Sequence, residues 1–241
     1  MMPTFSVDKS FELPSIGPWS CTMKILAKNL IPSLGSLEAF RPFFPGDIPP
    51  WDWLPAIAIA LQSLKMDGGE MNSFVHPEAN ISPSATVGGP VYIGARTEVR
   101  AGVCIRGFAI IGENCVIGSG CEIKNALIGD RAQVPHLNYV GDSILGQESH
   151  LGAGAILANL RFDKKNIAVA AGGKRIETGR KKFGAAIGDG AQIGCNAVLR
   201  PGTVIGKNSI VYDGVSFGGY LPDGHIARLR QELEIVKVKE T

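Results

Sequence analysis

Aliphatic residues recur at every sixth position through most of the 241-residue chain. Helices place apolar residues with a period of 3.6 and simple strands with a period of 2, so a sustained period of six fits neither alone. Glycine often follows the aliphatic residue at once, as in Ile93-Gly94 and Ile117-Gly118, and permits tight turns. The pattern predicts an all-β solenoid of very short strands whose aliphatic side chains point inward.

The repeat has two small slips and one long interruption. It runs in one frame from Val75 through Ile81, Val87, Ile93, Val99, Ile105, Ile111, Ile117 and Ile123. It slips by one residue to Ile128, Val134 and Val140, slips again to Leu145, Leu151 and Leu157, and resumes at Ile187, Ile193, Leu199, Ile205, Val211 and Phe217.

This pattern resembles the hexapeptide-repeat acyltransferases, whose fold is a left-handed parallel β-helix with three hexapeptides per coil. The resemblance implies such a helix over residues 75–220; the left hand comes from the resemblance only, because ordinary parallel crossovers are right-handed. With 18 residues per coil, Arg106 and Lys124 should stack on successive coils, roughly 5 Å apart. Two such cations repel unless an anion lies beside them, although two solvated surface cations are an open alternative.

The segments outside the repeat are expected to cover its ends. Residues 1–74 should form a partly helical segment, with helix-compatible stretches at 21–30 and 53–66, that caps the first coil. Residues 40–53 read as a turn-rich connector and residues 65–73 as a linker. The C-terminal tail, 221–241, is compatible with a helix that caps the last coil.

The interruption at residues 158–184 is strongly basic, with eight lysines and arginines against Asp163 and Glu177. A long loop inside a compact solenoid is more often functional than accidental, and this charge suits a phosphorylated ligand. A solvated basic face is the alternative interpretation.

The overall composition limits the classes of partner that the protein is expected to bind. The formal net charge of +2 gives no reason to expect nucleic acid or a membrane surface, and no stretch resembles a secretory signal or a membrane span. Five cysteines, none in a CxxC pair, indicate reduced thiols in a cytoplasmic protein and no zinc site.

A narrower resemblance is carried by "VPHLNYVGDSILGQESHLGAGAILANLRFDKK" and "GKRIETGRKKFGAAIGD". These runs resemble the acetyltransferase domain of bifunctional, archaeal-type sugar-1-phosphate nucleotidylyltransferases. The resemblance implies a homotrimer that transfers an acetyl group from acetyl-CoA to an amino-sugar 1-phosphate, glucosamine 1-phosphate first, in the pathway to UDP-N-acetylglucosamine. Nothing in residues 1–74 resembles the nucleotidylyltransferase domain of that family.

The same resemblance implies roles for individual residues. His136 matches the general base, a role that suits an imidazole at neutral pH. Tyr139, His150 and Asn159 match positions that contact the sugar. Arg106, Lys124 and Lys165 match positions around its phosphate. Ala153 and Cys195 match positions whose backbone borders acetyl-CoA. His150 stands where the family commonly has asparagine, and Ala168 where archaeal relatives have lysine. Cys195 is expected to be a small buried thiol at a corner rather than a nucleophile.

Two other functions share this fold. Trimeric γ-class carbonic anhydrases bind zinc through three histidines, and the four histidines here lack that paired spacing. A non-catalytic trimer that binds a sugar phosphate or nucleotide sugar, related to UDP-N-acetylglucosamine pyrophosphorylases, is the second. Free thiol release from acetyl-CoA in the presence of glucosamine 1-phosphate separates it from the enzyme.

Overall fold

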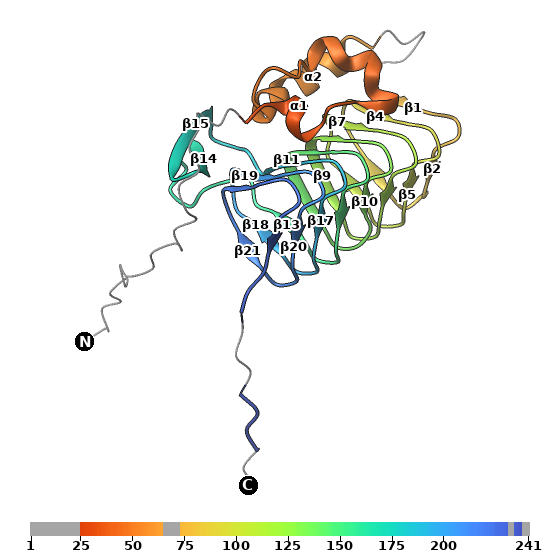
Figure 1. Ribbon diagram of the computed structural model, residues 1–241. Coiled ribbons are helices and arrows are strands. Elements are labelled where there is room, and N and C mark those ends of the chain that lie inside the picture. Colours follow the sequence, from red (N-terminus) through yellow and green to blue (C-terminus); the bar gives the residue numbers. More distant parts are fainter. Residues whose placement is uncertain (1–24, 65–72, 231–233, 238–241) are drawn as a thin grey trace, which may run out of the picture.

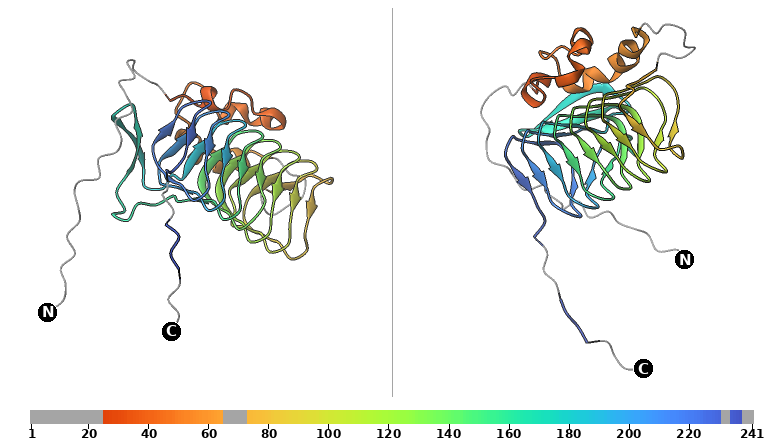
Figure 2. Two further views of the ribbon diagram at one scale, coloured as in Figure 1. Left: turned by 60° about the horizontal axis from the view of Figure 1, so that its bottom comes forward. Right: turned by 90° about the vertical axis from the view of Figure 1, so that its right-hand side faces the viewer.

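The computed structural model describes residues 25–64, 73–230 and 234–237, and its main body is a three-sided solenoid. The strands of successive coils pair in parallel, which confirms the predicted all-β parallel solenoid and agrees with a left-handed β-helix. Figures 1 and 2 show the coils stacked along one axis, with the helical N-terminal segment lying along one side. Strands β9 (Glu122–Ile128) and β11 (Tyr139–Leu145) run round a corner and so belong to two faces.

The strands divide among three faces of the solenoid. The first face contains β1 (Phe74–Val75), β4 (Val91–Ile93), β7 (Ala109–Ile111), the ends of β9 and β11, β16 (Ala185–Ile187), β19 (Thr203–Ile205) and β22 (Tyr220–Leu221). The second contains β2 (Asn80–Ile81), β5 (Glu98–Val99), β8 (Val116–Ile117), β10 (Gln133–Val134), β12 (His150–Leu151), β17 (Gln192–Ile193), β20 (Ile210–Val211) and β23 (Ile226–Ala227). The third contains β3 (Thr86–Val87), β6 (Cys104–Ile105), the beginnings of β9 and β11, β13 (Ile156–Leu157), β18 (Val198–Leu199) and β21 (Ser216–Phe217).

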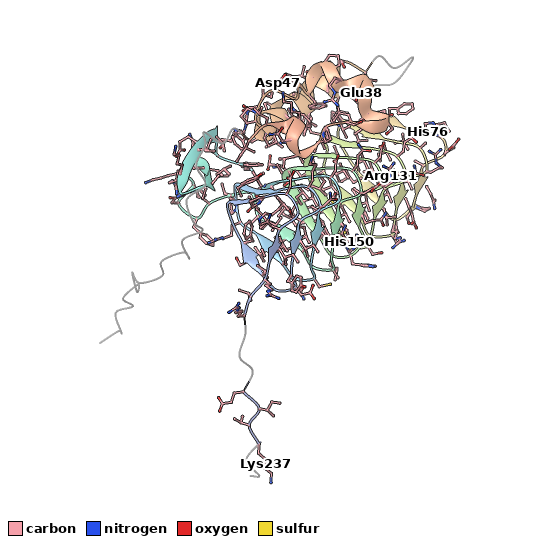
Figure 3. The ribbon with its side chains drawn as sticks, in the orientation of Figure 1. Glu38, Asp47, His76, Arg131, His150 and Lys237 are labelled. Carbon is pink, nitrogen blue, oxygen red and sulfur yellow. The ribbon has the colours of Figure 1, made fainter. Side chains whose placement is uncertain are left out.

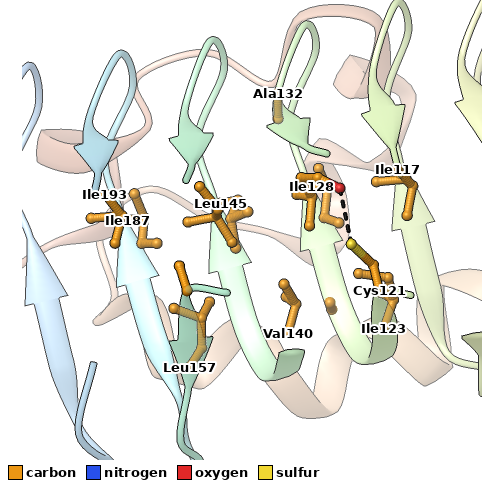
Figure 4. Packing of buried hydrophobic residues seen from close by; sticks show 14 of the residues in the cluster. Ile117, Cys121, Ile123, Ile128, Ala132, Val140, Leu145, Leu157, Ile187 and Ile193 are labelled. Carbon is orange, nitrogen blue, oxygen red and sulfur yellow. Dashed lines mark hydrogen bonds between the residues drawn. The ribbon is translucent and has the colours of Figure 1, made fainter. Parts of the chain in front are cut away.

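The register explains the two slips in the repeat. Ile93 lies opposite Ile111, a step of 18 residues, but Ile111 lies opposite Ile128 and Ile128 opposite Leu145, steps of 17. Each slip therefore shortens one corner by a residue while the aliphatic side chains stay in line. From Ile93 to Val211 these side chains form the buried core of the solenoid, and Figure 4 shows part of it stacked from coil to coil.

The outside of the first face is apolar as well. Its outward residues Ile110, Leu127 and Ile144 are fully buried beneath the N-terminal segment. That segment consists of α1 (Ala27–Leu30), the 3₁₀ helices η1 (Gly35–Phe43) and η2 (Pro50–Trp53), and α2 (Leu54–Gln62).

The expected cap over the first coil is therefore wrong for the described residues, because the segment covers a face and Val75 in β1 remains 42% exposed. The helix-compatible stretches at 21–30 and 53–66 contain α1 and α2, respectively. The predicted connector at 40–53 contains the last residues of η1 and all of η2. Residues 21–24 and most of the expected linker at 65–73 lie outside the described residues.

The basic interruption is more ordered than a loop. Strands β14 (Ile167–Ala171) and β15 (Lys174–Arg180) form an antiparallel hairpin, joined at Gly172-Gly173, where both φ angles are positive. Residues alternate between buried and more exposed along β14, so one side of the hairpin packs into the apolar cluster shared with the N-terminal segment. The guanidinium of Arg180 contacts Asp52 at 2.8 Å, which joins the hairpin to that segment.

The tail does not form the expected helix in its described part. Residues Ile226 and Ala227 form β23, residues 228–230 and 234–237 have no regular structure, and Ile235 is 89% exposed. Among the described residues, no helix has the length and apolar character needed to cross a membrane.

Candidate functional site

Three predicted site residues share one corner of the solenoid, where the second face turns into the third. The amide of Gly154 donates to the carbonyl of His136 at 3.0 Å, and the amide of Asn196 donates to the carbonyl of Ala153 at 2.8 Å. These bonds join the turns of three successive coils, so His136, Ala153 and Cys195 lie in one column, roughly 5 Å apart per step. The predicted base and the two positions matched to acetyl-CoA are therefore neighbours along the axis.

The turn that carries His136 is held from inside. The main-chain amide of His136 donates to Oδ1 of the buried Asn138 at 3.1 Å, and Nδ2 of Asn138 donates to the carbonyl of Gly152 at 2.7 Å. The imidazole is exposed and makes no hydrogen bond or ion pair with any other described residue. A neutral imidazole in this position has a ring nitrogen available to accept a proton.

On the third face, polar side chains from three coils meet at the carboxylate of Asp142. Nδ2 of Asn125 donates to Oδ1 at 2.8 Å, and Nδ2 of Asn159 donates to Oδ2 at 2.5 Å. Nζ of Lys124 lies 3.8 Å from Oδ2. Nδ2 of Asn159 also donates to the Tyr139 hydroxyl at 3.2 Å. The structure thus brings together three predicted substrate residues: Lys124, Tyr139 and Asn159.

The predicted stack of Arg106 on Lys124 is confirmed. The amide of Arg106 donates to the carbonyl of Ile123 at 2.8 Å, which places the two cationic residues side by side on successive coils. The guanidinium of Arg106 forms an ion pair with Glu122 at 2.7 Å, and the ammonium group of Lys124 forms one with Asp142 at 3.8 Å. Each cation therefore has a carboxylate of its own, and the required anion is supplied by the protein.

Tyr139 lies between these groups and stays protonated at neutral pH. Partial burial, followed by the negative charge of Glu122, raises the pKa of its phenol above the ordinary value near 10. Because Asn159 donates to the phenol oxygen, the hydroxyl proton is directed elsewhere and is available to a ligand.

Two predicted substrate residues do not join this cluster. Lys165 is exposed in the segment before the hairpin, where its amide bonds to Asp163. His150 lies on the second face, opposite Gln133 and Gln192, on the side of the solenoid away from the helices (Figure 3). It lines an open surface pocket of about 320 Å³ that also borders Cys195 and Tyr212.

The expectation of a buried thiol at Cys195 is wrong. Cys195 is exposed, and its amide donates to the Asp213 carboxylate of the next coil at 2.7 Å. It stands two residues after the core residue Ile193 and so lies on the outer turn. Cys115 and Cys121 stand four residues after a core isoleucine and are buried.

Sequence reasoning did not identify the acidic part of the cluster. Glu122 and Asp142 pair with the cations, and Asn125 holds Asp142. Asp142 lies in the run that begins VPHLNYVGD, three residues after the predicted sugar contact Tyr139, and this proximity could have identified the carboxylate from the sequence. Within the described residues, no group of three or more His, Cys, Asp or Glu side chains could hold a metal ion.

Comparison with known proteins agrees with the repeat. A family model described as bacterial transferase hexapeptide (six repeats) matches residues 184–219, and one described as hexapeptide repeat of succinyl-transferase matches residues 109–135. The bifunctional sugar-1-phosphate nucleotidylyltransferase/acetyltransferase of Sulfurisphaera tokodaii is 39% identical over 153 residues, covering 56% of this chain and 38% of the relative. The bifunctional protein GlmU of Methanococcus aeolicus is 36% identical over 178 residues, covering 66% of this chain and 41% of the relative.

The chain therefore spans about two fifths, or less, of the length of these curated relatives. Among solved structures, the acetyltransferase domain of PglB from Neisseria gonorrhoeae in complex with acetyl coenzyme A is 19% identical, with a TM-score of 0.30, over 72% of this chain and 60% of that chain. The six-residue repeat, the parallel solenoid and the matched family models together show a hexapeptide-repeat fold, and over this solenoid the chain is similar to acyltransferases of the hexapeptide-repeat type.

Proposed function

We propose that this protein is an acetyl-CoA-dependent N-acetyltransferase that acts on an amino-sugar 1-phosphate, with glucosamine 1-phosphate as the first substrate to test. One observation carries the proposal. The exposed His136 stands at the turn that begins β11, and the same strand bears Tyr139 and leads to Asp142, around which Lys124 and Asn159 gather. A base and a polar, partly cationic recognition cluster thus flank one strand.

The reaction needs a base and no protein nucleophile. The sugar ammonium loses a proton to His136, and the free amine attacks the thioester carbonyl carbon of acetyl-CoA. A C–N bond forms, the C–S bond breaks, and the attacking nitrogen releases its second proton to water as the amide forms. The coenzyme A thiolate leaves and takes up a proton, which the imidazolium can return. The available imidazole of His136 suits this role.

The cluster on the third face is suited to the sugar phosphate. Tyr139 and Asn159 would contact sugar hydroxyls, and Lys124 and Arg106 would contact the phosphate, whose charge exceeds that of one carboxylate. Lys165 would reach this phosphate from the segment before the hairpin. As the resemblance implies, the working unit would be a homotrimer.

Acetyl-CoA would lie along the column of corners. Backbone groups at Ala153 and Cys195 face the same corner as His136, and the open pocket beside Cys195 and His150 offers room for part of the coenzyme's arm. His150 would then lie nearer to the coenzyme than to the sugar. The similarity to the Sulfurisphaera tokodaii relative, whose name includes acetyltransferase, supports an acetyl donor.

One observation favours a second function, sugar-phosphate binding without turnover. A catalytic imidazole is commonly oriented by a hydrogen bond to its second ring nitrogen, and no described residue supplies one to His136. A binding protein would keep the Lys124–Asn159 cluster and need no such orientation.

The test combines purified protein, acetyl-CoA and glucosamine 1-phosphate. Free thiol release that depends on the sugar, together with an N-acetylated sugar phosphate detected by mass spectrometry, would support the enzyme. Calorimetric binding of glucosamine 1-phosphate without thiol release would support the binding protein. If the protein shows no turnover and no binding, both functions are excluded for this substrate.

A further inference from the structure

The buried carboxylate of Asp142 determines how the side-chain amide of Asn159 is oriented. A carboxylate accepts hydrogen bonds and cannot donate them, so the atom of Asn159 that lies 2.5 Å from Oδ2 must be the amide nitrogen. Asn125 occupies Oδ1 at 2.8 Å from the preceding coil. The carboxylate is 9% exposed, which limits competition from water.

The orientation of the Asn159 amide in turn determines the direction of the Tyr139 hydroxyl proton. Nδ2 of Asn159 also donates to the phenol oxygen, at 3.2 Å, so the phenol accepts from Asn159 and must direct its own proton outward. Oδ1 of Asn159 makes no hydrogen bond with any other described residue. The pair therefore offers a ligand one acceptor, Asn159 Oδ1, and one donor, the Tyr139 hydroxyl.

Gly141 leaves the space that this arrangement needs. A Cβ atom on Gly141 would lie 2.5 Å from the Tyr139 oxygen and 2.8 Å from Nδ2 of Asn159, closer than real contacts allow. Tyr139, Gly141 and Asp142 belong to one strand, so one short segment supplies the hydroxyl, the space and the carboxylate.

We propose that Asp142 is a positioning residue that fixes the hydrogen-bonding polarity of the sugar subsite: Asn159 accepts from the substrate, Tyr139 donates to it, and Lys124 is held beside them. The proposal rests on the proposed function for its substrate. It implies a ligand with a donor, such as a hydroxyl or ammonium group, next to an acceptor oxygen.

The main test is Asp142→Asn, which keeps the size and tolerates the positive φ of 47° at this position. An asparagine can donate as well as accept, so Asn159 would no longer be fixed in one orientation. The KM for glucosamine 1-phosphate should rise about tenfold, and the KM for acetyl-CoA should stay within about twofold. An unchanged sugar KM, or an equal rise in both KM values, would overturn the proposal.

A second variant guards against misfolding. Asn125→Gly removes the amide that holds Oδ1, and glycine tolerates the φ of 47° found at Asn125. It should raise the sugar KM by a smaller factor, about threefold, without changing the KM for acetyl-CoA. No change in this variant, when Asp142→Asn does not fold, would count against the proposal.

Asp130→Asn is the matched control. Asp130 is also a buried corner carboxylate, with its Oδ1 accepting from the Glu113 amide at 2.9 Å, but its other partner is Ser36 of the N-terminal segment. It should lower Tm without altering either KM. If wild-type protein shows no turnover, the proposed function fails as an enzyme, and the same comparison is made on the Kd for glucosamine 1-phosphate. No binding by wild type would overturn the positioning role as well.

Discussion

Gly154 donates its amide to the carbonyl of His136 across one coil, at 3.0 Å. The backbone of this turn is thereby tied to the next coil, whereas the imidazole above it is exposed and bonds to no described residue. The position of this turn and the reactivity of the imidazole can therefore be tested separately, because the side chain of His136 can be removed without disturbing the backbone of the turn.

Accordingly, we expect His136→Ala to lower kcat by at least about 100-fold, with little change in the KM for either substrate. Its Tm should match that of the wild type, since the side chain has no described partner. Steady-state thiol release and thermal melting would measure both quantities. His76→Ala, on the first coil, should leave kcat intact, and retained activity in His136→Ala would remove this residue from the mechanism.

Arg106 is expected to act on the sugar phosphate rather than on stability. Its ion pair with Glu122 is exposed, and such pairs contribute little to stability because water and salt screen the charges. A phosphate would bind this guanidinium more strongly than one carboxylate does. Arg106→Ala should therefore raise the KM for glucosamine 1-phosphate about tenfold and barely change Tm.

Arg96→Ala is the matched control for that comparison. Arg96 forms exposed ion pairs with Glu78 and Glu113, on the second-face side of the same early coils. Its loss should leave both KM values unchanged. An Arg106 effect confined to acetyl-CoA would contradict the assignment of this residue to the sugar phosphate.

The period of six determined more of the fold than any other feature of the sequence. It predicted the inward residues, the 18-residue step and the stack of Arg106 on Lys124, because in a solenoid one inward side chain per strand must repeat in space. It could not predict what covers the first face. Ile110, Leu127 and Ile144 point outward, and their burial depends on a segment far away in the chain.

The acidic centre of the cluster was missed for a similar reason. Asp142 stands at a corner with positive φ, so its carboxylate meets Asn125 of the coil before and Asn159 of the coil after. Neither partner is a neighbour in sequence. The hairpin was missed because alanines fill alternate positions of β14, and their small side chains give a weak strand signal.

The exposed thiol of Cys195 provides a test of where acetyl-CoA lies. Cys115 is buried, and burial raises the pKa of its thiol to about 12, so it should resist alkylation near pH 7.5. Iodoacetamide should label Cys195 much faster than Cys115, as peptide mass spectrometry would show. Saturating acetyl-CoA should slow labelling of Cys195 about tenfold. Equal rates with and without acetyl-CoA would place the coenzyme elsewhere, and Cys195→Ser should remain active.

Asp189 should make stability depend on pH. Burial raises the pKa of this carboxyl to about 6, from an ordinary value near 3.8, while Oδ1 accepts the Gln147 amide at 2.8 Å. Because the folded state favours the neutral form, the stabilisation is complete below about pH 3.8 and is lost as the pH rises through about 6. Asp189→Asn remains neutral at every pH and keeps an acceptor for Gln147. The Tm of the variant minus that of the wild type should therefore increase between about pH 4 and 6.5 and then level off. Asp213→Asn, at an exposed carboxylate with the same kind of bond to a neighbouring coil, should show a much smaller trend, and a flat difference for Asp189→Asn would contradict the prediction.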